Sequence, residues 1–378
     1  MKKILFVLPW LALGGLERVQ VTIANALAEK GYDVTVMVLN NRLDLKDELD
    51  SRVHLIYKPY KPHKLMRRIP YIRHKFYDDG MWETRASAKT LYKYYVGNEK
   101  YDVEIGFFRG LSVKIISGST NKFSKKLAWV HSDFKHCGGV TNNFKIIEQT
   151  KNAYSKYDKI ICVSKQAENS FNEVIGLKNK TVTVYNMLPT ERILSEAEKP
   201  LQIKKAKKAL LSVGHLIDVK GYDRLLAAVK RLNSDGFDFD LWLIGYGKDE
   251  NKLKKYAADN DLYNVKFLGY QKNPYNYMKA ADLYICSSRF EGFNLTVAEA
   301  LFLEIPVLST NCTGPAEILG GGEYGMLVDN STEGLYNGIY GVIKDNALFA
   351  ELKGKAIMRK PFFDKSITLN SIITLFDG

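Results

Sequence analysis

The stretch LYICSSRFEGFNLTVAEALFLEIPVLST, from Leu283 to Thr310, has the pattern of a strand, a loop, a helix and a second strand. The run LYICSS is short and apolar, helical spacing begins near Asn294, and the apolar run after Ile305 enters the next strand. A strand, a crossover helix and a further strand form the unit from which parallel sheets are built. This stretch therefore predicts an α/β fold with a parallel sheet.

The same alternation runs through the chain in two series. The first begins with the strands KILFVLP and DVTVMVL and the helical segment 16–30 between them, and the second begins with ALLSVGHL. Continuous apolar strands imply sheets covered by helices on both faces. A length of 378 residues exceeds what one core usually holds. We therefore expect two Rossmann-like parallel-sheet domains facing each other across a cleft, at 1–190 and 191–362, with a C-terminal helix over about 363–378 able to pack back on the first. The charged segment 187–209 is typical of an interdomain linker.

Two glutamates lie on either side of the junction between loop and helix in the opening stretch. Glu291 follows the strand, and Glu299 falls on the second helical turn. Ligands of open parallel sheets bind beyond the carboxyl ends of the strands. The helix N-terminus presents the N–H groups of Phe293, Asn294 and Leu295 to an anion, whereas carboxylates accept hydrogen bonds from hydroxyls. One loop can thus hold a diphosphate between two hydroxylated rings, a ribose and a sugar.

Further phosphate-binding candidates follow other strands. Lys220 and Gly221 precede a helix, after a strand that ends at Gly214, and a lysine beside a helix N-terminus suits a diphosphate. Gly14 and Gly15 also close a strand and open a helix, although a simple tight turn explains them equally well.

Several common sites are disfavoured by the sequence. The dinucleotide fingerprint G-x-G-x-x-G is absent, which disfavours a dehydrogenase. Asp238 and Asp240 have the D-x-D spacing of metal–nucleotide sites, but they precede their strand and so belong to the wrong end of the sheet. The four cysteines form no C-x-x-C pair, so neither a zinc site nor a disulfide framework is indicated.

These motifs resemble those of the retaining glycosyltransferases of family four, which have the GT-B fold. The similarity runs through most of the chain and is strongest from Leu211 to Asp329. EGFNLTVAE is similar to the family's E-x7-E motif, and SVGHLIDVKGYD is similar to its phosphate-binding segment. GGLERV resembles the N-terminal glycine loop, WVHSDF resembles the histidine strand of the first domain, and LIGYG and FLGY resemble two further landmarks.

The resemblance implies a role for each matching residue in binding a nucleotide sugar. Glu299 would hold the ribose hydroxyls, and Glu291 would contact the transferred sugar. Lys220 would neutralise the diphosphate, with help from Gly14, Gly15 and the amides of Phe293 to Leu295.

The resemblance also implies roles for residues outside this loop. His131 would lie by the reacting face of the sugar, although a core or capping role is the alternative and the nearby His136 could compete for it. Gly269 and Tyr270, or their backbone, would lie near the base. The family commonly has an arginine where this chain has His215. His215 would therefore contact the diphosphate without carrying a permanent positive charge.

Charge is concentrated in one segment. The chain carries a net charge of +13, and residues 51–77 contain eight Lys or Arg, three His, five aromatic residues and no Asp or Glu. Such a segment suits an anionic membrane surface, and a solvated loop is the alternative. Nothing resembles a nucleic-acid-binding module, so we expect no nucleic-acid partner.

The N-terminus MKKILFVLPWLALGGLERV has the charge and apolar run of a secretory signal, but Pro9 and Trp10 interrupt the run and a helical pattern follows directly. No apolar run approaches the ~20 residues that a membrane-spanning helix requires. We therefore expect a cytoplasmic protein with peripheral contact at the inner face of the plasma membrane.

The function expected from the resemblance is transfer of a sugar from a nucleotide-diphosphate sugar to an acceptor hydroxyl, with retention at the anomeric carbon. A lipid-linked glycan in surface polysaccharide synthesis, such as O-antigen or capsule, is the expected acceptor. We expect no cofactor and no metal, because Lys220 and oriented amides can stabilise a leaving diphosphate. The alternatives are a GT-B sugar-nucleotide epimerase and a non-catalytic nucleotide-sugar-binding protein.

Overall fold

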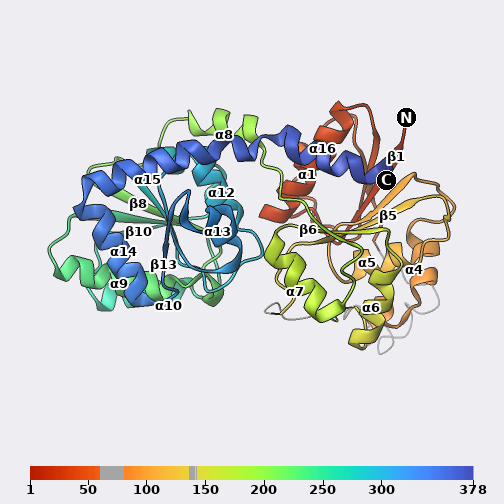
Figure 1. The fold of residues 1–378 in the computed structure, drawn as a ribbon, viewed down its shortest axis with the longest axis horizontal. Helices are drawn as coiled ribbons and strands as arrows, with labels where there is room; N and C mark the ends of the chain where they lie inside the picture. Colours follow the sequence, from red (N-terminus) through yellow and green to blue (C-terminus); the bar gives the residue numbers. More distant parts are fainter. Residues whose placement is uncertain (60–80, 136–140, 142, 378) are drawn as a thin grey trace. The chain divides into compact units, whose positions relative to one another are not determined.

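The computed structural model describes residues 1–59, 81–135, 141 and 143–377. The chain divides into two compact units (Figure 1). Unit 1 comprises Met1–Met187 and Ser366–Gly378, and unit 2 comprises Leu188–Lys365. Each unit is built on one parallel sheet with helices between its strands, so the prediction of two parallel-sheet α/β domains is confirmed.

Unit 1 has a seven-stranded sheet in the order β3-β2-β1-β4-β5-β6-β7. Its strands are β1 (Lys3–Leu8), β2 (Asp33–Val38), β3 (His54–Tyr57), β4 (Val103–Gly106), β5 (Lys125–Val130), β6 (Lys159–Cys162) and β7 (Thr181–Thr183). Its helices are α1 (Gly15–Glu29), η1 (Lys46–Glu48), α3 (Met81–Arg85), α4 (Ala88–Tyr95), α5 (Leu111–Ser117), α6 (Ile147–Ser155), α7 (Lys165–Ile175) and α16 (Lys365–Asp377). The interior strand β1 is buried from Ile4 to Leu8, as its unbroken apolar sequence requires.

Unit 2 has a six-stranded sheet in the order β10-β9-β8-β11-β12-β13. Its strands are β8 (Lys208–Val213), β9 (Phe239–Ile244), β10 (Val265–Gly269), β11 (Leu283–Cys286), β12 (Val307–Thr310) and β13 (Met326–Val328). Its helical segments are α8 (Thr190–Ala197), η4 (Asp218–Lys220), α9 (Tyr222–Ser234), α10 (Glu250–Asp259), α11 (Tyr275–Ala280), α12 (Leu295–Phe302), α13 (Thr313–Ile318), η5 (Gly320–Gly322), α14 (Thr332–Lys344), α15 (Asn346–Arg359) and η6 (Lys360–Phe363).

The core of unit 2 gathers the apolar sides of its helices against the sheet. Leu225, Leu226 and Val229 recur at helical spacing on α9 and are fully buried. They share one cluster with Leu335 and Ile339 of α14 and with the inward side chains of the strands. Burial of each such side chain contributes about 1.5–3 kcal/mol, so this packing holds the sheet rigid beneath the loops at its edge.

The prediction that segment 187–209 is an interdomain linker is wrong for its first part. Residues Thr190–Ala197 form α8, which packs within unit 2 through the buried side chains of Ile193 and Ala197. Asn273 Nδ2 donates to the carbonyl of Glu196 at 2.8 Å and ties the helix to the segment before α11. The charged residues of α8 outnumber its two buried apolar residues, so the helical pattern is hard to recognise in the sequence.

The C-terminal helix α16 belongs to unit 1. The ring of Phe376 meets Tyr32 edge to face at a centroid distance of 5.8 Å, and Lys2 Nζ donates to the carbonyl of Phe376 at 3.3 Å. Within the described residues, none of the helices combines the length and apolar character needed to cross a bilayer.

Two predictions concern residues beyond the described ranges. The basic segment 51–77 is described only as far as residue 59, where it forms β3 at the edge of the sheet of unit 1, and its remainder lies outside the described residues. His136 also lies outside them.

Candidate active site

Unit 2 has its topological switch point between β8 and β11, where the strand order reverses. The segments 214–221 and 287–294 leave the carboxyl ends of these two neighbouring strands. In open parallel sheets, ligands bind in the crevice at such a switch point. The topology therefore brings the predicted phosphate-binding lysine and the first glutamate to one edge of the sheet.

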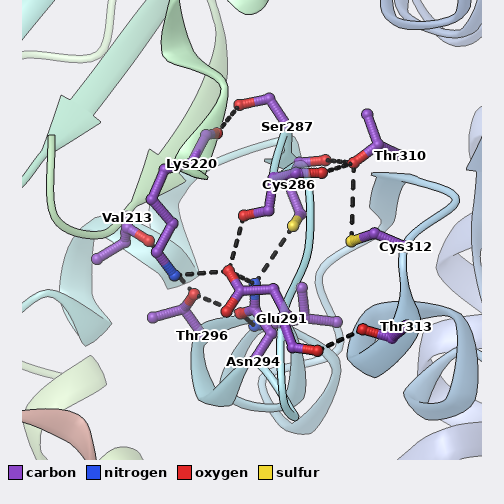
Figure 2. A network of polar contacts seen from close by, with 12 residues as sticks. Val213, Lys220, Cys286, Ser287, Glu291, Asn294, Thr296, Thr310, Cys312 and Thr313 are labelled. Atoms are coloured by element: carbon purple, nitrogen blue, oxygen red, sulfur yellow. Dashed lines mark hydrogen bonds and ion pairs between the residues drawn. The ribbon is translucent and has the colours of Figure 1, made fainter. Parts of the chain in front are cut away.

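Lys220 and Glu291 form an ion pair at this edge, with 2.6 Å between Nζ and Oε1 (Figure 2). Their side chains are 23% and 14% exposed, so water screens the pair only in part. Oε1 also accepts hydrogen bonds from Ser288 Oγ at 2.7 Å and from Asn294 Nδ2 at 3.0 Å. Within the described residues, Oε2 of Glu291 accepts none. That oxygen is left to accept a hydrogen bond from a ligand hydroxyl.

The positive charge at the site resides on Lys220. Burial acts to lower the pKa of Lys220, but the charge of Glu291 and the hydrogen bond to it outweigh burial and raise the pKa. Burial and then the charge of Lys220 lower the pKa of His215. At neutral pH the imidazole of His215 is therefore uncharged.

Asn294 connects the start of α12 to this pair. Its backbone is left-handed, with a φ of 82°, which is unusual for a residue with a Cβ atom. Its Oδ1 accepts from the N–H of Val297 at 3.1 Å and caps the helix. The backbone N–H groups of Asn294 and Leu295 donate to no acceptor in the described part of the chain. These N–H groups supply two donors for an anion, while the third predicted amide belongs to Phe293, whose side chain is buried.

Gly221 allows the two loops to meet. Its φ is +66°, and a Cβ at this position would lie 2.1 Å from the carbonyl oxygen of Ser287. Both the backbone angle and the lack of space require glycine here. The short segment η4, which carries Lys220, can therefore lie directly against the loop that carries Glu291.

Glu299 is buried on the second turn of α12, with 9% of its surface exposed. Its Oε1 accepts a hydrogen bond from the hydroxyl of Tyr275 on α11 at 3.1 Å. The structure therefore holds this carboxylate in a fixed position on the same helix that begins at the N–H groups of Asn294 and Leu295.

Three aromatic rings follow the carboxyl ends of β8, β9 and β10. The ring of Tyr246 lies 5.4 Å from that of His215 and 6.0 Å from that of Tyr270. Tyr246 and Tyr270 are 46% and 44% exposed, so both rings offer surface to a planar ligand. Gly269 precedes Tyr270 with a φ of +65°, and its carbonyl accepts from the N–H of Gly245 at 2.8 Å. Tyr246 was not among the predicted site residues, although its place directly after an apolar strand was a usable signal.

Gly14 and Gly15 lie in unit 1, where Gly14 is the N-cap residue of α1 and Gly15 is its first residue. A Cβ on Gly14 would lie 2.1 Å from a carboxylate oxygen of Glu17. Glu17 accepts a hydrogen bond from Trp10 Nε1 at 2.7 Å, and burial raises its pKa. A carboxylate therefore lies close to the predicted diphosphate contact.

His131 also lies in unit 1, at the carboxyl end of β5. Its Nε2 is 2.8 Å from the carbonyl oxygen of Phe107, and since a carbonyl only accepts, Nε2 carries the proton. Burial lowers the pKa of His131 to about 4. The imidazole is thus neutral at physiological pH, and its Nδ1, which has no hydrogen-bond partner within the described residues, is an acceptor.

The described residues contain no group of three or more His, Cys, Asp or Glu side chains arranged to hold a metal ion. Asp238, part of the D-x-D spacing, lies before β9 and forms an ion pair with Lys207.

Comparison with known proteins shows similarity in sequence and in fold. Residues 195–358 match the profile of the family described as Glycosyl transferases group 1. An uncharacterized glycosyltransferase of Haemophilus influenzae is 27% identical over 94% of each chain. The N-acetylgalactosamine-N,N'-diacetylbacillosaminyl-diphospho-undecaprenol 4-alpha-N-acetylgalactosaminyltransferase of Campylobacter jejuni is 30% identical over 56% of this chain and 58% of its own. The crystal structure of Anabaena HepE in complex with UDP and glucose matches the whole of both chains, with a TM-score of 0.78 and 18% identity.

The two parallel-sheet units and these similarities define the class. The chain has the GT-B fold and is a glycosyltransferase.

The buried neutral His131 predicts a loss of stability in acid. Its pKa in the folded protein is about 4 against an ordinary 6.5, so the unfolded chain takes up a proton that the folded chain does not. The stability that this group contributes is complete above pH 6.5 and falls as the pH drops towards 4, by about 2.5 kcal/mol at pH 4.5. In thermal unfolding, His131→Gln should lose less stability between pH 7 and pH 4.5 than the wild type. The variant His54→Gln, which removes an exposed imidazole, is the control, and equal pH slopes for wild type and His131→Gln would contradict the assignment.

Proposed function

We propose that the chain is a retaining glycosyltransferase of family four that moves a sugar from a nucleoside-diphosphate sugar to an acceptor hydroxyl. The supporting observation is the ion pair of Lys220 and Glu291 beside two unpaired helix N–H groups, at the switch point of unit 2. A cation and N–H donors suit a diphosphate, and the open Oε2 of Glu291 suits a sugar hydroxyl.

The ion pair also gives the donor a direction. The transferred sugar is bonded to the distal phosphate, and Glu291 is the proposed contact of that sugar. Because Lys220 Nζ lies 2.6 Å from Glu291, Lys220 would face the distal phosphate, close to the N–H groups of Asn294 and Leu295. Unit 2 would then act as the donor-binding domain and unit 1 as the acceptor-binding domain.

The nucleoside would lie further along the same edge. Glu299 would accept hydrogen bonds from the ribose hydroxyls and share its carboxylate with Tyr275. The rings of Tyr246 and Tyr270 and the backbone of Gly269 would flank the base. HepE was crystallised with UDP, so uracil is the first base to test.

In unit 1, the residues proposed to contact the donor are His131, Gly14 and Gly15. A neutral His131 that donates through Nε2 can accept through Nδ1 from a sugar hydroxyl, but it does not supply a proton. Its proposed contribution is to orient the sugar at the reacting face.

The proposed reaction breaks the bond between the anomeric carbon and the distal phosphate oxygen and forms a bond to the acceptor oxygen on the same face. The leaving phosphate takes the acceptor proton, so no protein nucleophile is assigned. Negative charge grows on the diphosphate in the transition state, where Lys220 and the N–H groups at α12 stabilise it. We propose that the positive charge of Lys220 and these N–H donors make the reaction independent of a metal or cofactor.

Lys220→Ala should reduce turnover by about 100-fold or more, because the main cation facing the leaving group is lost. Steady-state turnover measures the effect, and circular dichroism checks that the fold survives. Lys255→Ala, which removes an exposed lysine of α10, is the control and should leave turnover unchanged. Near-normal activity of Lys220→Ala would show that the phosphate assignment is wrong.

The stereochemistry and the metal requirement can be measured in one reaction. The anomeric proton of the product, observed by NMR, should show the configuration of the donor sugar, and turnover should survive EDTA. An inverted product would exclude a retaining enzyme, and a strict Mg²⁺ requirement of the chemical step would exclude the metal-independent reaction.

We further propose a lipid-linked glycan as the acceptor, reached at the anionic inner face of the plasma membrane. The name of the Campylobacter jejuni relative includes a diphospho-undecaprenol glycan. The basic, aromatic composition of 51–77 supports contact with anionic lipid.

Sedimentation with liposomes tests the membrane proposal. The protein should bind vesicles that contain anionic lipid and should not bind neutral ones, because the attraction is electrostatic. Replacement of Arg67, Arg68, Arg73 and Lys75 by Gln should abolish binding. Replacement of Lys204, Lys205, Lys207 and Lys208 by Gln makes the same change in net charge elsewhere and should not. Equal loss of binding in both variants, or binding that ignores lipid charge, would contradict the proposal.

A further inference from the structure

Arg289 joins the two ends of the short segment that carries Lys220. Its Nη1 donates to the carbonyl oxygen of Asp218 at 2.6 Å, at the start of η4. Its guanidinium also forms a two-pronged ion pair with Asp223 in the first turn of α9, at 2.9 Å and 2.8 Å to the two carboxylate oxygens. Asp218 and Asp223 lie on either side of Lys220, so one guanidinium spans the segment.

The backbone reinforces this connection. The N–H of Arg289 donates to the carbonyl of Val219 at 2.8 Å, and Ser287 Oγ donates to the carbonyl of Lys220 at 2.7 Å (Figure 2). The backbone carbonyl of Arg289 in turn accepts a hydrogen bond from Nδ2 of Asn330, which lies between β13 and α14, at 2.8 Å. Arg289 is therefore anchored to the body of unit 2 while its side chain holds η4.

A segment of this kind needs an external support. The 3₁₀ turn η4 comprises only Asp218–Lys220, and a single 3₁₀ turn has little stability of its own. The Arg289 and Asp223 side chains are 29% and 46% exposed, so their ion pair adds little to the stability of the whole unit. Its effect falls instead on the local conformation that aims Lys220 at Glu291.

We propose that Arg289 is a positioning residue, which holds Lys220 in place to bind the distal phosphate of the donor. This inference rests on the proposed function, because it assigns to Arg289 an effect on the contact that Lys220 makes there. Arg289 does not touch the donor itself. Its loss lets the lysine leave its binding position, so the cost falls on ligands that carry the distal phosphate.

The test compares UDP with UMP, which lacks the distal phosphate, by isothermal titration calorimetry. Should a thermal-shift panel select another base, its diphosphate and monophosphate replace this pair. In Arg289→Ala, affinity for UDP should fall about tenfold, while affinity for UMP should change less than about twofold. Arg289→Lys, which keeps the charge but not the two-pronged geometry, should lie between wild type and alanine.

Two further variants separate positioning from general stability. Asp223→Asn should reproduce part of the loss, and the double variant Arg289→Ala with Asp223→Asn should be no weaker than Arg289→Ala alone, because both act through one pair. Arg231→Ala removes another exposed ion pair of unit 2, between α9 and Glu333 of α14, and should leave both affinities unchanged.

The outcomes distinguish this inference from the proposed function. If Lys220→Ala binds UDP as well as the wild type, the proposed function fails. If Lys220→Ala loses UDP affinity but Arg289→Ala does not, the positioning role of Arg289 is wrong. Equal losses of UDP and UMP in Arg289→Ala, or the same loss in Arg231→Ala, would also overturn it.

Discussion

The site in unit 2 depends on one ion pair that is largely withdrawn from water, Lys220 with Glu291. Either charge alone would be costly in this position, because an uncompensated buried charge is destabilising by several kcal/mol. Together the two charges draw Ser288 and Asn294 into one network around a single carboxylate oxygen. The network joins η4, the loop after β11 and the start of α12. Since a buried ion pair is weak evidence for stability, its place at the switch point is better explained by what it can bind.

Sheet topology explains how residues so distant in sequence come to share this site. The strand order places β8 beside β11, although β9, β10 and three connecting α-helices lie between them along the chain. The segments after these strands then meet at one edge, and Gly221 lets them approach to a distance that no other residue allows. Arg289 adds a second connection between the same segments. Each link is individually modest, but all of them fix the same geometry, which is the condition for a preorganised site.

Much of this could be predicted from the sequence, because the informative signals are local. Unbroken apolar runs identified the strands, and the position of Glu291 directly after one of them placed it at the ligand-binding edge. The misassigned segment 187–209 shows the opposite case, because α8 buries only Ile193 and Ala197 within charged surroundings. The partners of Arg289 and the ring of Tyr246 were missed because they depend on contacts between segments far apart in sequence, which periodicity does not reveal.

The protonation states of the site have a consequence for donor binding. His215 is uncharged at neutral pH, so Lys220 carries the positive charge of this pair of residues. An ammonium group has three N–H donors, and within the described residues Lys220 Nζ uses one of them, towards Glu291. Two donors remain for phosphate oxygens without breaking the ion pair. In the proposed binding mode, Glu291 would therefore stay fixed by Lys220, Ser288 and Asn294 while a diphosphate binds, and its free Oε2 would be oriented before the sugar binds. A site in which the diphosphate displaced Glu291 from Lys220 would lose that orientation at the moment it was needed.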